Sequence, residues 1–186
     1  MPGARPLVLA SRSPQRSAIL TRLGIHFTVR PTDVPERESG DPSAAALANA
    51  LAKARAALRS SAEELVLGVD TLVELDGRIY GKPEDETHAR KTLRALSGAT
   101  HTVLSAVALL EGANERTAVA RTRVRFRELD ERMIDWYVST GEWRGRAGGY
   151  AIQGAGAALV REVDGDYENV VGLPVAALLD LVPTLL

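Results

Sequence analysis

An unbroken apolar run at residues 65–69 is the strongest signal in the pattern of hydrophobic and polar positions. It reads Leu-Val-Leu-Gly-Val, and Asp70 and Thr71 follow it directly. Such a run is typical of a strand buried on both faces, as in the sheet of an α/β protein. Ligands of these proteins bind in the crevice beyond the carboxyl ends of the strands. The pattern therefore predicts that the strand ends at Asp70 and that this carboxylate stands at a cleft mouth, able to hold a metal ion or orient a water, unless it only begins the turn of a hairpin.

The first third of the chain alternates predicted strands with predicted helices. Ser13 and Pro14 are typical of a helix N-terminus, as the cap and the first helical residue, and Gly24 is typical of a helix end. The elements expected here are strands at 7–10 and 27–29, a helix between them, a polar loop at 31–42, and a long helix rich in Ala and Leu from 43 to about 62.

Strands become more frequent in the rest of the chain. Asp76-Gly77 is the dipeptide most typical of a two-residue β-hairpin turn, and Asp130 is a typical helix cap. The elements expected here are a hairpin at 72–80, a helix at 84–96, strands at 102–110 and 118–126, a helix from 130 to 138, strands at 150–153 and 157–163, and a closing helix at 174–181. This order predicts a mixed α/β sheet with flanking helices, in a single domain over 1–186, rather than a helical bundle or a sandwich.

Composition narrows the classes of function. The 186 residues are 45% hydrophobic and 25% charged, which is ordinary for a folded soluble protein. A net charge of −1 gives no basic field for duplex DNA or RNA, so we expect no nucleic-acid partner. The apolar stretch at 6–10 is too short for a signal peptide or a transmembrane helix, so we expect a cytoplasmic protein with no membrane partner. The oligomeric state stays open, a homodimer included.

The same composition limits the kind of metal site. The chain has no cysteine, which removes disulfides, zinc–thiolate sites and thiol nucleophiles. Its histidines, His26, His88 and His101, are scattered without the spacing of metal ligands. We therefore expect any metal ion to be a hard cation held by carboxylates and phosphates.

Ser11, Ser13 and Arg16 surround the predicted start of the first helix. A short strand that leads into a helix N-terminus leaves free N–H groups and a positive dipole end facing the crevice. Two hydroxyls and a guanidinium can complete a phosphate site there. The alternative is a well-capped helix with a surface arginine.

Three kinds of charged position can complete a site around Asp70. A carboxylate of the polar loop, Glu36 or Glu38, can share a divalent cation with Asp70 across the cleft. Lys53 on the Ala-rich helix and Lys82 in the stiff Gly-Lys-Pro turn can reach a triphosphate. The alternatives are solvated loop glutamates, a lysine at the polar edge of a helix, and an ordinary surface lysine.

A glycine-rich segment at 146–154 contains a strand-like core. Glycines permit the close approach of a backbone to a ligand. Gln153 offers both a donor and an acceptor to the edge of a base, although a plain glycine-rich connection is the alternative.

Together these motifs resemble the Maf family of nucleoside triphosphate pyrophosphatases, first known as septum-formation inhibitors. The matching blocks run in family order over almost the whole chain: Leu-Ala-Ser-Arg-Ser-Pro at 9–14 with Arg16, Asp-Val-Pro-Glu at 33–36, Lys-Ala at 53–54, Gly-Val-Asp-Thr at 68–71, Gly-Lys-Pro at 81–83, Leu-Arg-Ala-Leu-Ser-Gly at 93–98, Ala-Gly-Gly-Tyr at 147–150, Ile-Gln-Gly at 152–154, Gly-Asp-Tyr at 165–167 and Val-Gly-Leu-Pro at 171–174.

The resemblance implies an inosine-triphosphatase-like α/β fold with two lobes around a central cleft. It implies hydrolysis of a nucleoside triphosphate between the α and β phosphates, with Mg²⁺ or Mn²⁺ as cofactor, and an association with arrest of cell division. The implied roles are catalysis by Asp70, metal binding by Glu36 and Asp70, and binding of the triphosphate by Ser11, Ser13, Arg16, Lys53 and Lys82. Whether Asp70 acts as metal ligand, as base or as both stays open.

Three positions bear on the choice of nucleotide within the family. Thr71 and Gln153 match the branch that acts on dTTP and UTP, whereas the 7-methyl-GTP branch typically carries Trp, Gln and Glu where this chain has Gln15, Thr71 and Gln153. Gln15 also replaces the usual Arg, which removes a cation. We expect hydrolysis of dTTP and UTP with looser discrimination. The alternatives are a 7-methyl-GTP pyrophosphatase and a nucleotide-binding regulator of division with little catalysis.

Overall fold

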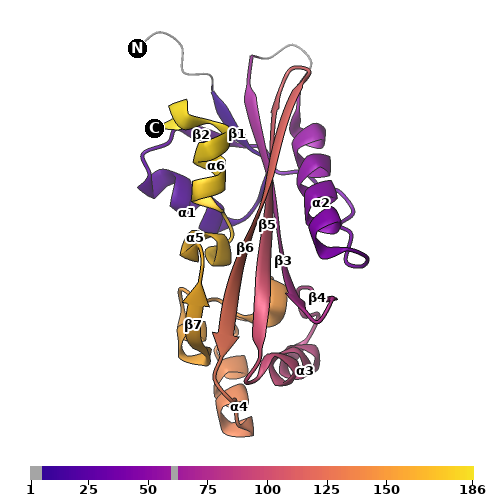
Figure 1. The fold of residues 1–186 in the computed structure, drawn as a ribbon, viewed down its shortest axis with the longest axis vertical. Helices are drawn as coiled ribbons and strands as arrows, with labels where there is room; N and C mark the ends of the chain where they lie inside the picture. The colour runs from indigo at the N-terminus through magenta and orange to yellow at the C-terminus, as the bar shows by residue number, and fades with distance from the viewer. Residues whose placement is uncertain (1–5, 60–62) are drawn as a thin grey trace.

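A mixed, seven-stranded sheet runs through an elongated molecule (Figure 1), in a computed structural model that describes residues 6–59 and 63–186. The strands are β1 (Leu7–Leu9), β2 (Phe27–Val29), β3 (Leu65–Leu75), β4 (Arg78–Tyr80), β5 (Thr100–Glu111), β6 (Asn114–Phe126) and β7 (Val160–Asp164). Their order is β2-β1-β3-β5-β6-β7, and β4 pairs with β3. β1 is parallel to β2 and β3, and the other pairings are antiparallel.

Helices pack on both faces of the sheet and at one end of it. They are α1 (Pro14–Arg22), α2 (Pro42–Ala57), α3 (Glu86–Leu96), α4 (Glu131–Ser139), α5 (Tyr167–Val171) and α6 (Val175–Leu181), with 3₁₀ turns η1 (Ala147–Gly149), η2 (Ala155–Leu159) and η3 (Pro183–Leu185). In Figure 1, α2 lies on one side of the long strands, α1 and α6 lie on the other, and α3 and α4 lie at the opposite end. Within the described ranges, no helix is long and apolar enough to cross a membrane.

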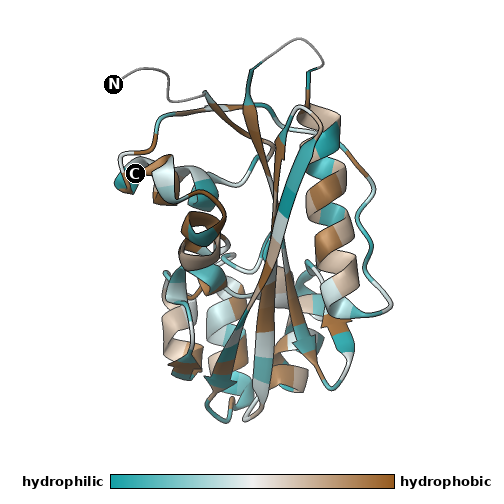
Figure 2. Ribbon diagram, turned by 45° about the horizontal axis from the view of Figure 1, so that its top comes forward, coloured by the Kyte–Doolittle hydropathy of each residue, from teal (hydrophilic) through white to brown (hydrophobic). Residues whose placement is uncertain are grey.

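The apolar core follows the same division. One buried cluster packs the sheet against α1 and α6, and a second, rich in alanine, packs it against α2. A third cluster joins α3 and α4 to the far halves of β3, β5 and β6. Figure 2 shows apolar and polar residues alternating along α2, as expected for a helix with one side on the sheet. The predicted α/β class with a mixed sheet and flanking helices is confirmed.

A break in the sheet edge lies beside Asp70. β3 pairs with β1 at Leu65–Leu67 and with β4 from Val73 to Leu75. Between these stretches, residues 68–72 pair with β5 on one side, and the described part of the chain places no strand on the other. The prediction that the strand ends at Asp70 is therefore wrong. β3 continues because β5 pairs along its length, and the crevice forms beyond the end of β1 instead.

Several other predicted boundaries are also wrong. α2 begins at Pro42 with Asp41 as its cap, and it ends at Ala57 rather than near residue 62, which lies outside the described residues. Residues 150–153 form no strand: they follow a turn in which Gly148 and Gly149 have positive φ angles. The strand predicted at 157–163 begins only at Val160, after η2, and α5 was not predicted.

The backbones of α2 and β3 approach each other closely at Gly68. A Cβ atom on Gly68 would lie 2.1 Å from the carbonyl oxygen of Ala50 and 2.8 Å from the amide nitrogen of Ala54. Only glycine fits at this position of β3, and small residues are needed on the facing side of α2. The contact also brings the polar side chains of α2 next to the break in the sheet edge.

We predict that Gly68→Ala lowers the free energy of unfolding by about 3 kcal/mol, because the added methyl group forces α2 away from the sheet. Urea denaturation followed by circular dichroism measures this change. Gly81→Ala is the control, since its Cβ atom would lie 3.6 Å from the nearest atom, Glu38 Oε1. Equal losses in the two variants would contradict the prediction.

Candidate active site

A cleft of about 750 Å³ opens at the break in the sheet edge. Its walls come from the start of α1, the loop before α2, β3, the Gly81–Pro83 turn, the segment around η1, and the end of α5. It is lined by all the residues to which the sequence assigned a role: Ser11, Ser13, Gln15, Arg16, Glu36, Lys53, Asp70, Thr71, Lys82 and Gln153. The structure thus brings these distant positions together around one cavity.

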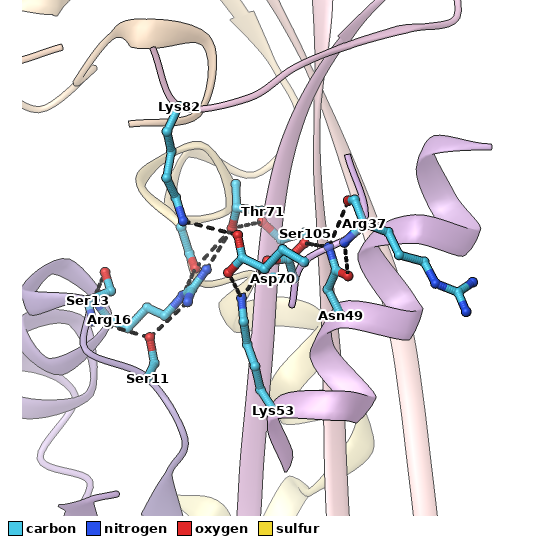
Figure 3. Close-up of polar contacts among 12 residues, drawn as sticks. Ser11, Ser13, Arg16, Arg37, Asn49, Lys53, Asp70, Thr71, Lys82 and Ser105 are labelled. Carbon is cyan, nitrogen blue, oxygen red and sulfur yellow. Dashed lines mark hydrogen bonds and ion pairs between the residues drawn. The ribbon is translucent and has the colours of Figure 1, made fainter. Parts of the chain in front are cut away.

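Both oxygens of the Asp70 carboxylate have a partner. The side chain of Asp70 is only 4% exposed, and its Oδ1 lies 2.6 Å from Lys53 Nζ. Its Oδ2 accepts a hydrogen bond from Asn49 Nδ2 at 2.9 Å (Figure 3). Asn49 and Lys53 are four residues apart on α2 and therefore project from the same side of the helix. Asp70 is thus held in a fixed orientation at the base of the cleft.

Asn49 is a site residue that the sequence reasoning missed. Its amide also binds the polar loop: Oδ1 accepts from the backbone nitrogen of Arg37 at 2.7 Å, and Nδ2 donates to the Arg37 carbonyl oxygen at 3.1 Å. Its position one helical turn before Lys53 was the available signal. Through Asn49, the loop that carries Glu36 is fixed relative to Asp70.

Acidic and basic groups alternate across the cleft. Lys53 Nζ lies 2.6 Å from Asp70 Oδ1 and 2.6 Å from Glu36 Oε1. Lys82 Nζ, whose side chain is 53% exposed, lies 3.2 Å from Glu36 Oε2. Burial raises the pKa of Glu36, but Lys53 and Lys82 outweigh it and hold this pKa below its ordinary value. Glu36 is therefore a carboxylate at neutral pH.

The donor chemistry between Asp70 and Glu36 fits a hard divalent cation. The Lys53 ammonium lies between the two carboxylates, so a positive charge is already stabilised there. Among the described residues no group of three or more His, Cys, Asp and Glu side chains can hold a metal ion. Two protein carboxylates with substrate phosphates and water are a usual ligand set for Mg²⁺. Asp70 and Glu36 would then be the protein ligands.

Arg16 is a buried cation whose hydrogen-bond partners, among the described residues, include no carboxylate. It donates from Nε to the Gly172 carbonyl oxygen at 2.8 Å, from Nη1 to Ser11 Oγ at 2.9 Å, and from Nη2 to Thr71 Oγ1 at 3.1 Å. Burial lowers its pKa, while Asp70 and Glu36 act in the opposite direction. A guanidinium stays charged at such a site, so it offers positive charge to an anion in the cleft.

The predicted selectivity residues lie on different walls. The Thr71 hydroxyl lies between Arg16 and Ser105, whose Oγ is 2.8 Å away. Gln15 is on α1, where its Oε1 accepts from Ser13 Oγ at 3.1 Å. Gln153 is an exposed side chain on the opposite wall. All three residues line the cleft, where Gln153 is exposed and Gln15 and Thr71 are half-buried.

Ser13 is the N-cap of α1. Its side-chain oxygen accepts from the Arg16 backbone nitrogen, at 3.5 Å, while Ser11 Oγ accepts from the Ser13 backbone nitrogen at 3.2 Å. Both hydroxyls line the cleft. The capped start of α1 therefore also forms part of the cleft wall. The two interpretations of this motif, a helix cap and a phosphate site, are compatible.

We predict that Asn49→Ala lowers the free energy of unfolding by about 2 kcal/mol, because it leaves buried polar groups of Asp70 and Arg37 without a partner. Amide exchange at Arg37 should become faster, as its N–H loses its acceptor. Hydrogen–deuterium exchange and urea denaturation measure the two effects. Asn114→Ala, at an exposed hairpin position, is the control; unchanged exchange at Arg37 would refute the role of Asn49.

Comparison with known proteins gives a consistent result. A family model described as Maf-like protein matches residues 6–185. The chain is 42% identical over 180 residues to a dTTP/UTP pyrophosphatase of Pyrococcus furiosus, which covers 96% of this chain and 94% of that protein. It is 47% identical over 179 residues to one of Moorella thermoacetica, covering 94% and 92%, and 44% identical over 181 residues to one of Pelotomaculum thermopropionicum, covering 95% of each. Because the family model spans nearly the whole chain and these relatives are 42–47% identical to it, the chain belongs to the Maf family.

Proposed function

We propose that this protein hydrolyses dTTP and UTP to the nucleoside monophosphate and pyrophosphate, with a divalent metal ion as cofactor and in the cytoplasm, where free nucleotides are found. The observation that carries the proposal is the alternating chain of charges from Asp70 through Lys53 and Glu36 to Lys82, in a cleft of nucleotide size. The relatives named dTTP/UTP pyrophosphatase, at 42–47% identity over most of the chain, support the choice of substrate.

The reaction makes one bond and breaks one. A water oxygen attacks the α-phosphorus, and the bond from this phosphorus to the bridging oxygen breaks, so that pyrophosphate leaves. Catalysis of such a step consists mainly of positioning and of stabilising the negative charge that builds up on the leaving group. Mg²⁺ or Mn²⁺, when bound, would supply additional charge neutralisation on the phosphate oxygens.

The two lysines have different positions relative to solvent. Lys82 is half exposed and its ion pair with Glu36 lies at the surface, where such pairs contribute about 1 kcal/mol or less. Lys82 can therefore turn from Glu36 to a phosphate oxygen at small cost. Lys53 is only 12% exposed and pairs with both carboxylates, so a triphosphate that draws its ammonium group away from Asp70 must reach the inner part of the cleft.

Asp70 is the group that we assign to catalysis. It is the one fully buried carboxylate among the described residues. When Lys53 turns toward the triphosphate, Oδ1 becomes free to accept the proton of the attacking water, while Asn49 continues to hold Oδ2. The hydrogen bond from Asn49 therefore holds the Asp70 carboxylate in one orientation when it takes up the proton and loses its negative charge.

A panel of nucleoside triphosphates, assayed with Mn²⁺ for release of pyrophosphate, tests the proposal. We predict that dTTP and UTP are hydrolysed best and that Asp70→Asn, which keeps the shape and removes the charge, lowers turnover by about 10²-fold or more. Circular dichroism checks that this variant is folded. Nucleotide binding without turnover would favour the regulator of division, and near-normal turnover of Asp70→Asn would remove this residue from the mechanism.

Gln15 is expected to loosen the choice of nucleotide. A glutamine lacks the fixed charge and the several donors of an arginine, so we predict that Gln15→Arg increases discrimination against other nucleotides by about 1–2 kcal/mol. Competition between UTP and 7-methyl-GTP measures this discrimination. A preference of the unmodified protein for the methylated purine would overturn the assignment to dTTP and UTP.

A further inference from the structure

One wall of the cleft lacks regular secondary structure beyond a single 3₁₀ turn. This wall, residues 146–153, includes η1 and lines the cleft through Arg146, Ala147 and residues 150–153. Its last residue, Gln153, is exposed to the cavity. A segment without a strand or helix ladder needs other contacts to hold one conformation. In this structure, residues on the side of the wall that faces away from the cleft supply these contacts.

The glycines of the wall are fixed against β3 and the Gly-Lys-Pro turn. The Gly148 backbone nitrogen donates to the Gly81 carbonyl oxygen at 3.1 Å, and a Cβ atom on Gly148 would lie 2.8 Å from a methyl group of Val73. A Cβ atom on Gly149 would lie 3.0 Å from the ring of Pro83. Both glycines have positive φ angles, which other residues adopt at a cost. The first half of the wall is thus close-packed.

Two buried side chains hold the second half of the wall. His101, on β5, lies with its Nε2 2.8 Å from the Tyr150 hydroxyl oxygen. Tyr137, on α4, accepts a hydrogen bond from the Ala151 backbone nitrogen at 2.9 Å. His101 and Tyr137 are both at most 1% exposed. They therefore anchor two successive residues of the wall to the sheet and to a helix.

An aromatic cluster surrounds the His101 anchor. The rings of His101, Phe126 and Tyr150 meet edge to face in all three pairs, with centroid distances of 4.8 to 5.4 Å. Edge-to-face packing of this kind fixes the direction of each ring. Burial lowers the pKa of His101 to about 4, so the imidazole is neutral over the range in which nucleotide hydrolysis is assayed.

We propose that His101 and Tyr137 are positioning residues for recognition of the nucleobase: His101 fixes the side chain of Tyr150, Tyr137 fixes the backbone at Ala151, and together they set the direction in which Gln153 meets the base. Neither side chain lines the cleft. The inference rests on the proposed function, because it concerns the choice of base by the same cleft. Recognition sites depend on supports of this kind, since small displacements of a contacting group reduce its discrimination.

The test compares UTP with CTP, which share the sugar and triphosphate and differ at position 4 of the base. Tyr137→Phe and His101→Leu each remove one anchor. Both variants should lower the ratio of kcat/KM for UTP to that for CTP by about tenfold. The loss should appear as a higher KM for UTP, with kcat changed by less than about twofold, because the groups around Asp70 are untouched. His101→Gln, which keeps a polar partner for the Tyr150 hydroxyl, should restore most of the ratio.

Ile134→Val is the control for a general loss of stability. Ile134 is buried on the same helix as Tyr137 and in the same apolar cluster, so the variant should unfold at a lower temperature with an unchanged ratio. If His101→Leu does not fold, the test rests on Tyr137→Phe. That variant is the smaller change, because it removes a single oxygen atom. An equal fall of the ratio in Ile134→Val and Tyr137→Phe, or an unchanged ratio in Tyr137→Phe, would overturn the inference.

Measurements on the wild-type protein distinguish a failure of this inference from a failure of the proposed function. Absence of UTP hydrolysis would refute the proposed function before any variant is compared. Equal efficiency with UTP and CTP would leave hydrolysis in place and overturn the inference, because there would be no preference for the wall to maintain.

Discussion

The contact between Gly68 and α2 is the constraint on which the rest of the site depends. The backbone of β3 touches the backbone of α2 where Gly68 faces Ala50 and Ala54, at a separation that leaves no room for a β-carbon. This close approach lets the short side chain of Asn49, as well as Lys53, reach the carboxylate on β3. The alanine-rich composition of α2, which reads as unremarkable helix-forming sequence, is thus what places an amide and an ammonium group on the two oxygens of one aspartate.

Local chemistry in the sequence predicted much of the fold, and long-range pairing explains most of the errors. The Ser13 cap, the Asp76-Gly77 turn and the Asp130 cap are formed as expected, because each depends on residues within a few positions. The end of the strand at Asp70 was wrong, because a run of apolar residues does not reveal how far β5 pairs along it. The tightly turned segment 150–153 was mistaken for a strand for a related reason: its conformation depends on contacts from β5 and α4.

The positions around the cleft were predictable from the matching motifs, but their contacts were not. Every residue given a role lines one cavity. The sequence did not indicate that Lys53 lies between two carboxylates, nor that the Thr71 hydroxyl is bound by Arg16. For Asn49 the sequence offered only its position one helical turn before Lys53, which does not reveal that its amide binds Asp70 and Arg37. Such contacts depend on the distance between elements that are far apart in the chain, which patterns of residue type do not encode.

The continuity of the long strands also bears on how the two lobes can move. β3 pairs with β5 without interruption from Val66 to Glu74, and β5 pairs with β6 over its full length. The same strands therefore form part of both lobes, one packed against α1, α2 and α6 and the other against α3 and α4. A hinge between the lobes would have to bend or break these ladders, unlike hinges at loops. The strand ladders thus favour a preformed cleft, and the loop that carries Glu36 is the wall that has no regular structure. Side chains hold this loop: Asn49 binds Arg37, and Lys53 and Lys82 pair with Glu36. We therefore expect any adjustment to a bound molecule in this loop rather than between the lobes.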